Sequence, residues 1–153
     1  MEVFRISHKD HSKALTASGS ANRWNLDGEY VIYTGSTRSL STLEMVVHRN
    51  SIKRLPDYEV MIISIADEEE LFEQILIKDL PINWRSIKSY HILQSIGSRW
   101  YKELRSLVLK IPSAVITKEY NYIINTKHPR FNDSVNLVRN EDYFFDSRLF
   151  NSK

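Results

Sequence analysis

Glu44 is the carboxylate whose position in the sequence most strongly suggests chemistry. Residues 36–49 show helical periodicity, with one apolar face predicted at Leu40, Leu43 and Val47. Glu44 borders that face, and the opposite, exposed side is expected to hold Ser41, Thr42 and Arg49. A carboxylate beside a buried face costs on the order of several kcal/mol unless it is paired or faces a cavity. The spacing alone leaves two interpretations open: a structural ion pair with a lysine or arginine, or a carboxylate of a functional site.

A second candidate group is the tract Arg23-Trp24-Asn25, which precedes a predicted buried strand. Arginine suits a diphosphate ligand because its guanidinium keeps its charge and offers donors in a fixed fork. Trp24 could stack on a ligand ring, but a lone tryptophan more often closes a core, and we favour that interpretation. Tyr33 is the fourth residue of the predicted strand, and its ring fits either core packing or a site.

Two polar residues near predicted strand ends complete the candidates. Ser113 follows Pro112, where a serine commonly caps a turn, and no Gly-x-Ser-x-Gly tract surrounds it as an acyl-transfer nucleophile requires. Asn121 opens the short tract NYIIN. His8 and His11 lie three residues apart in a polar stretch, and we expect them to be solvated. The sequence therefore predicts no metal site.

Composition excludes several further classes of site and protein. The chain of 153 residues has no cysteine, so thiolate catalysis, thiolate zinc sites and disulfides are excluded. It has neither a P-loop nor a Gly-x-Gly-x-x-Gly tract. Lysine and arginine number 21 against 19 acidic residues, which disfavours direct nucleic-acid binding. No apolar run has the roughly 18 residues of a membrane span, and the N-terminal stretch lacks the features of a signal peptide. We therefore expect a cytoplasmic protein.

The elements that must position these residues are short and mixed. We predict helices over 36–49, 67–75 and 92–106, the last with a stripe of Leu93, Ile96, Trp100, Leu104 and Leu107. We predict strands over 3–6, 30–34, 58–65, 107–111, 114–117, 135–138 and 143–145, and a long loop over 7–29. Because the helices and strands do not alternate steadily, the expected fold is α+β: one compact domain over 1–153 with a mixed central sheet.

Taken in order, these pieces resemble the RES domain, a family named for its Arg, Glu and Ser. The matching tracts are FRI at 4–6, GSANRWNLDGEYVIYTGS at 19–36, STLE at 41–44, LPINW at 80–84, IGSRWYKE at 96–103, LVLKIPSAVI at 107–116, EYNYIINTKHPRF at 119–131 and FFDSRL at 144–149. The resemblance spans almost the whole chain. One departure is that the family often has paired glycines before its Arg-Trp, where this chain has Ala21 and Asn22.

The resemblance implies a fold similar to that of ADP-ribosylating toxins, and a site. Arg23, Tyr33, Glu44 and Ser113 fall on the family's site positions. By this resemblance we assign catalytic roles to Glu44, Arg23 and Tyr33 and a substrate-binding role to Ser113. Two further residues, Arg5 and Asn121, match recurring family positions and are expected to bind substrate.

The resemblance also implies a function. Family members are toxins of bacterial toxin–antitoxin pairs whose activity consumes NAD⁺ by hydrolysis, phosphorolysis or transfer of ADP-ribose to a protein. Their partner is an Xre-like antitoxin with a helix-turn-helix, and we expect a higher-order complex with it. NAD⁺ would be the substrate and no cofactor is expected. The alternatives are an ADP-ribosyltransferase, a degenerate member that only binds a partner, and, more remotely, a toxin that targets nucleic acid.

Overall fold

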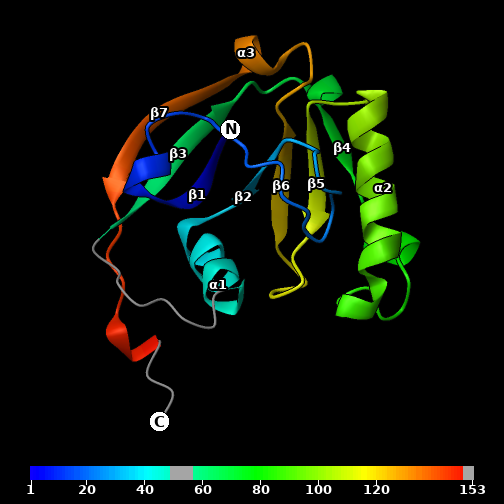
Figure 1. The fold of residues 1–153 in the computed structure, drawn as a ribbon, viewed down its shortest axis with the longest axis horizontal. Helices are drawn as coiled ribbons and strands as arrows, with labels where there is room; N and C mark the ends of the chain where they lie inside the picture. Colours follow the sequence, from blue (N-terminus) through cyan, green and yellow to red (C-terminus); the bar gives the residue numbers. More distant parts are fainter. Residues whose placement is uncertain (49–56, 150–153) are drawn as a thin grey trace.

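The computed structural model describes residues 1–48 and 57–149 and shows a seven-stranded sheet with helices packed on it (Figure 1). The strands are β1 (Glu2–His8), β2 (Val31–Gly35), β3 (Tyr58–Ile65), β4 (Phe72–Gln74), β5 (Val108–Pro112), β6 (Tyr120–Asn125) and β7 (Val135–Asp142). The helices are α1 (Arg38–His48), α2 (Tyr90–Glu103) and the short α3 (Phe131–Ser134). The predicted α+β class with a mixed sheet is confirmed.

The strand order across the sheet is β4-β5-β6-β2-β1-β3-β7. The β4–β5 pair is parallel, and every other neighbouring pair is antiparallel. β1 pairs with β3 along its whole length, whereas its register with β2 consists of the single pair Phe4–Gly35. The sheet is therefore nearly divided into two halves, β4-β5-β6-β2 and β1-β3-β7, which meet where β1 and β2 touch.

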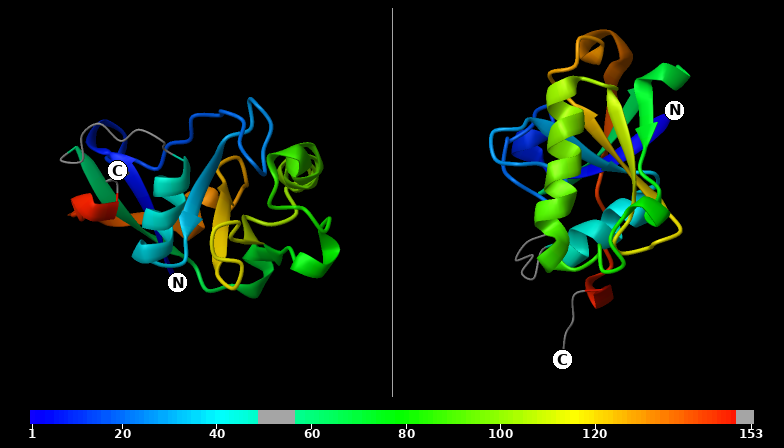
Figure 2. Two further views of the ribbon diagram at one scale, coloured as in Figure 1. Left: turned by 90° about the horizontal axis from the view of Figure 1, so that it is seen from below. Right: turned by 90° about the vertical axis from the view of Figure 1, so that its right-hand side faces the viewer.

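Helix α1 lies at this junction and packs against both β1 and β2 (Figure 2). It begins after Thr37, whose Oγ1 accepts a hydrogen bond from the Leu40 backbone N–H at 3.0 Å, as an N-cap residue does. The Ser41 hydroxyl donates to the Phe4 carbonyl of β1 at 3.0 Å. A Cβ atom on Gly35 would overlap the Ser41 side chain, so the glycine allows α1 to approach the end of β2.

The predicted faces of this helix were partly wrong. Ser41, expected on the exposed side, is buried, and Leu43 and Val47, expected in the core, are 36% and 58% exposed. The buried positions are Leu40, Ser41 and Met45. The hydroxyl of Ser41 is satisfied by backbone carbonyls, so it can take a core position that hydrophobicity alone would deny it. Arg49 lies outside the described residues.

Helix α2 covers the other half of the sheet, next to β5 (Figure 1). Leu93 and Trp100 pack against Leu109 and Ile123, and Trp24 joins the same cluster with 2% of its surface exposed. The interpretation of Trp24 as a core residue is confirmed. The helix ends at Glu103, earlier than predicted, because Leu104 adopts a left-handed conformation (φ 52°) and turns outward, 40% exposed.

Three predicted elements were wrong. Residues 67–75, expected to be helical, form a single 3-10 turn at Glu69–Leu71 followed by β4, because Phe72–Gln74 pair with β5. Residues 114–117 form a turn and not a strand, because the Ser113 hydroxyl accepts hydrogen bonds from the backbone N–H groups of Val115 and Ile116. Residues 143–145 are irregular, because the ladder of β7 with β3 ends at the pair Glu59–Asp142.

Besides β4, one further strand, β6, was not predicted. β6 lies at the centre of its half-sheet, between β2 and β5, yet asparagines at positions 121 and 125 lower its apparent strand propensity. Both asparagine side chains are used in the fold: Asn121 donates to Glu44, and Asn125 donates to the Tyr101 carbonyl at 3.0 Å. Across residues 1–48 and 57–149, no helix is long and apolar enough to cross a membrane.

Candidate active site

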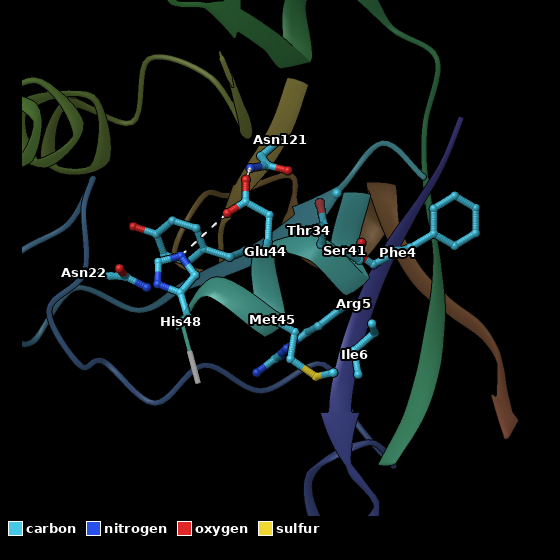
Figure 3. A pocket seen from close by; sticks show the side chains of 12 residues that line it. Phe4, Arg5, Ile6, Asn22, Thr34, Ser41, Glu44, Met45, His48 and Asn121 are labelled. Atoms are coloured by element: carbon cyan, nitrogen blue, oxygen red, sulfur yellow. Dashed lines mark hydrogen bonds and ion pairs between the residues drawn. The ribbon is translucent and has the colours of Figure 1, made fainter. Parts of the chain in front are cut away.

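The Glu44 carboxylate lies where α1 faces the ends of β5 and β6 (Figure 3). Its Oε1 accepts hydrogen bonds from the Ser113 hydroxyl at 2.7 Å and from the Asn121 side-chain amide at 2.5 Å. Its Oε2 lies 3.6 Å from Nε2 of His48, one helical turn later. The two carboxylate oxygens therefore have different surroundings: Oε1 is held by two neutral donors, and Oε2 faces the imidazole.

These contacts keep Glu44 ionised. Burial by itself would raise the pKa of the Glu44 carboxyl, but the nearby His48 imidazole and the hydrogen bonds from Ser113 and Asn121 outweigh it and leave the pKa below its ordinary value. Because the folded state then binds this proton less tightly than the unfolded chain, the contribution to stability is present at neutral pH. It is lost as the pH falls through the carboxyl range. At neutral pH the site holds a negative charge.

Three adjoining cavities surround this carboxylate. The first has a volume of about 230 Å³ and is lined by residues from β1, β2 and α1, including Arg5 and Tyr33. A smaller one of about 40 Å³ lies toward Arg23, and an open one of about 330 Å³ extends past Arg23 to Arg85. Among the described residues, Glu44 and His48 are the two that line all three cavities. The Glu44–His48 pair therefore lies at the junction of the whole cleft.

Tyr33 contributes its ring to the cleft, while its hydroxyl holds the preceding loop. The hydroxyl donates to Asn25 Oδ1 at 2.7 Å and accepts from the Trp24 backbone N–H at 3.1 Å. Burial raises the pKa of the Tyr33 hydroxyl above its ordinary value, so the group stays protonated. Tyr33 lines the first cavity and the smaller one, of about 230 and 40 Å³. This geometry favours stacking of a ligand ring on Tyr33.

Arg23 is held at the mouth of the cleft by backbone carbonyls and an aromatic ring. Its Nη1 donates to the carbonyls of Trp84 at 3.3 Å and Arg85 at 3.0 Å, and its guanidinium lies 4.6 Å from the ring centre of Tyr90. These contacts fix the side chain without neutralising it. Its positive charge is therefore available to a ligand.

Arg5 occupies the opposite end of the cleft. Its Nη1 donates to the Thr16 carbonyl at 2.8 Å, and burial lowers the pKa of its guanidinium below the ordinary value. Within the parts of the chain that the structure describes, Arg5 has no ion-pair partner. An arginine that is partly buried and lacks a counter-charge is suited to an anionic ligand.

The loop that carries Arg23 is anchored on α2. The buried Glu29 carboxylate accepts hydrogen bonds from the Ser98 hydroxyl and the Leu26 backbone N–H, and Gln94 donates to the Asn22 carbonyl at 2.8 Å. A Cβ atom on Gly97 would overlap the Trp24 carbonyl oxygen, so the helix and the loop are in direct contact there. No pattern in the sequence marked Glu29 as a buried carboxylate.

We expect Gly97→Ala to destabilise the protein by about 1–3 kcal/mol, because the added methyl must displace the backbone at Trp24. The same displacement should move Arg23. It should therefore raise KM for an anionic substrate by a larger factor than it lowers kcat. Urea unfolding and steady-state kinetics measure the two effects. Ser95→Ala, on the exposed side of the same helix, is the matched control and should change neither. A Gly97→Ala variant as stable as wild type would contradict the close contact.

The structure brings together all six residues named from the sequence. Glu44, Ser113 and Asn121 are linked by hydrogen bonds, and the cavities are lined by Arg5, Arg23, Tyr33, Glu44 and Asn121. Ser113 is fully buried behind Glu44, and its hydroxyl also binds two backbone N–H groups. Its position suits it to hold the carboxylate. The roles assigned to these residues remain predictions.

Sequence reasoning missed two ionisable residues among those described in the cleft. His48 lies four residues after Glu44, and that helical spacing was the signal that could have identified it. Arg85 donates from Nε to the Ala114 carbonyl at 2.9 Å and lines the open cavity, but no pattern in the sequence marked it. Over the described residues, no cluster of three or more His, Asp or Glu side chains could hold a metal ion.

Comparison with known proteins identifies the family. Residues 2–146 match the model of the RES domain, and the chain belongs to that family. It is 34% identical over 127 residues to a Yersinia enterocolitica protein named Toxin Res, covering 83% of this chain and 82% of the relative. It is 30% identical over 126 residues to a Sphingobium protein named Prs ADP-ribosylating toxin, covering 82% of this chain and 78% of the relative.

The fold is also found in a solved structure. A chain of the Mycobacterium tuberculosis MbcT–MbcA toxin–antitoxin complex superposes with a TM-score of 0.71 at 14% sequence identity. The match covers 93% of this chain and 83% of that chain. At this identity the likeness concerns the fold alone.

Proposed function

We propose that the protein is the toxin of a toxin–antitoxin pair and that it consumes NAD⁺ by cleaving the bond between nicotinamide and ribose. The observation that carries the proposal is the placement of an ionised carboxylate, Glu44, at the junction of a cleft whose three arginines have no acidic partner among the described residues. The cleft offers positive charge for a diphosphate and negative charge for a cation.

The distribution of ion pairs supports an anionic ligand. Away from the cleft, five arginines face carboxylates: Arg38, Arg105, Arg130, Arg139 and Arg148. The exposed Arg99 of α2 is the exception among the described residues. Arg5, Arg23 and Arg85, which line the cleft, have no such ion pair within 1–48 and 57–149. Guanidinium groups bind phosphate oxygens in a bidentate manner and remain charged at every physiological pH. The diphosphate of a dinucleotide supplies the missing counter-charge.

The carboxylate suits the bond that is broken. Cleavage of the nicotinamide–ribose bond develops positive charge on the ribose ring, as in glycoside hydrolysis. Glu44 is held through Oε1, so its negative charge has a fixed position and needs no reorganisation during the reaction. Nicotinamide leaves as a neutral molecule, and therefore no strong acid is needed. The Tyr33 ring offers a surface on which the nicotinamide can stack.

Transfer of ADP-ribose to a protein is the second candidate reaction. The Sphingobium relative is named an ADP-ribosylating toxin, and cleavage of the same bond with a different acceptor gives that activity. The open cavity next to Arg85 leaves room for an acceptor larger than water. We propose an Xre-like antitoxin as the partner, in a higher-order complex, and action in the cytoplasm, where NAD⁺ is available. The toxin–antitoxin complex that shares the fold supports such a partner.

Incubation of the purified protein with NAD⁺ labelled in the ADP-ribose half tests the reaction. We expect nicotinamide release together with free labelled ADP-ribose, or its phosphorylated form when phosphate is present. Label that stays on protein after denaturation, in the presence of a cell extract, would favour transfer. Intact NAD⁺ after prolonged incubation under both conditions would contradict the proposal.

A further inference from the structure

We propose that His48 accepts the proton released when the attacking group is water, so that Glu44 and His48 act as a carboxylate–histidine pair. The inference rests on the proposed function and concerns the acceptor step of that reaction. It starts from the junction of the cleft, where Glu44 and His48 are common to all three cavities. Any ligand that spans these cavities passes both side chains.

The two carboxylate oxygens of Glu44 make different contacts. Oε1 already accepts from Ser113 and Asn121, whereas Oε2 faces His48 Nε2 at 3.6 Å (Figure 3). A carboxylate on one side of an imidazole fixes its orientation and stabilises the imidazolium that forms when the other nitrogen takes a proton. With Nε2 toward Glu44, the nitrogen left to accept the proton is Nδ1.

The solvent exposure of the two side chains supports a charge-stabilising role for Glu44 and a proton-accepting role for His48. The side chain of Glu44 is 19% exposed and that of His48 is 47% exposed. The carboxylate is thus protected where charge stabilisation is needed, while the imidazole reaches solvent and can pass on a proton. His48 lies on the last turn of α1, so the same helix fixes both partners four residues apart.

The chemistry requires such a group only for some acceptors. In hydrolysis the bond between nicotinamide nitrogen and ribose carbon breaks, and the electron pair leaves with nicotinamide, which becomes neutral. The ribose carbon then bonds to the oxygen of water, and one proton is released. We assign that proton to His48. An anionic acceptor such as azide brings no proton that must be removed, so its attack does not need His48.

His48→Gln tests the inference because glutamine keeps a polar group near the Nε2 position but cannot accept the proton. We expect hydrolysis of NAD⁺ to fall by about 10²-fold, in the range that general bases contribute. With azide added, we expect the variant to form the ADP-ribosyl azide within about threefold of the wild-type rate. His11→Gln, an exposed histidine outside the cleft, is the matched control and should leave both rates unchanged.

Two results would overturn the inference while leaving the proposed function intact. Hydrolysis by His48→Gln at the wild-type rate would show that no proton passes to His48. Equal loss with water and with azide, in a variant that melts like wild type, would show that His48 acts only by positioning Glu44. Failure of the wild-type protein to cleave NAD⁺ would instead contradict the proposed function itself.

Discussion

Replacement of Glu44 by glutamine should reduce NAD⁺ turnover by about 10²–10³-fold while the protein stays folded. A single well-placed electrostatic group stabilises a transition state by roughly 3–4 kcal/mol. Glutamine keeps an oxygen that can accept from Ser113 and Asn121, so the packing at the ends of β5 and β6 should survive. What it loses is the negative charge beside the developing cation. Nicotinamide release measured at saturating NAD⁺ reports this loss as a fall in kcat.

The matched control is Glu69→Gln, a change of the same type in the exposed turn before β4. It should leave turnover and thermal stability unchanged. If Glu44→Gln consumes NAD⁺ within about threefold of wild type, Glu44 holds α1 against the sheet and does not act on the substrate. Thermal melting of the variant separates the two cases, because a purely structural role predicts a lower Tm with normal turnover.

The strands on which the site is built were largely predictable because their sequences are strongly apolar. Residues 58–65 were expected to form a strand, and β3 covers the same range as the long central partner of β1 and β7. Apolar content did not predict the strand whose formation depends on pairing with a distant strand. Phe72–Gln74 follow an acidic, helix-like stretch, yet their backbone completes the edge of the sheet beside β5. Such pairing between distant segments is not encoded in local periodicity.

The site, too, depends on contacts between distant segments that local periodicity does not predict. Glu44 was identified because it borders an apolar face, but the face itself was misplaced, since Ser41 and not Leu43 is buried. The carboxylate was recognised for a partly wrong reason. Its real support comes from Ser113 and Asn121, which lie 69 and 77 residues away in the sequence. In the sequence, only the resemblance to a family indicated that these three residues belong to one site.

His48 shows what spacing can reveal once one residue of a site is known. An i, i+4 pair of glutamate and histidine on a predicted helix places the two side chains on one face. That pattern was present in the sequence, but it gained meaning only when Glu44 was placed at a cavity junction. Arg85 had no comparable signal, because its role depends on a loop being brought next to Arg23.

We expect expression of this protein alone to arrest bacterial growth, and co-expression with the product of the neighbouring gene to restore it. The physical reason is the open, positively charged end of the cleft. Arg23 and Arg85 have no acidic partner among the described residues, so a carboxylate from a partner chain can bind where the diphosphate binds. A partner that covers these arginines and Glu44 excludes the substrate. The two proteins should therefore co-purify.

In the purified complex, NAD⁺ turnover should fall at least about tenfold at micromolar protein if the partner binds with nanomolar affinity, and removal of the partner should restore it. Glu44→Gln provides the control, since it should still bind the partner but should not arrest growth when expressed alone. The wild-type protein and the Glu44→Gln variant are expressed in the same strain for this comparison. Full turnover by the intact complex would contradict blocking of the site. Regulation would then have to act on the synthesis or degradation of the toxin. Loss of turnover that parallels complex formation is the result expected for an antitoxin bound at the mouth of the cleft, over Arg23 and Glu44.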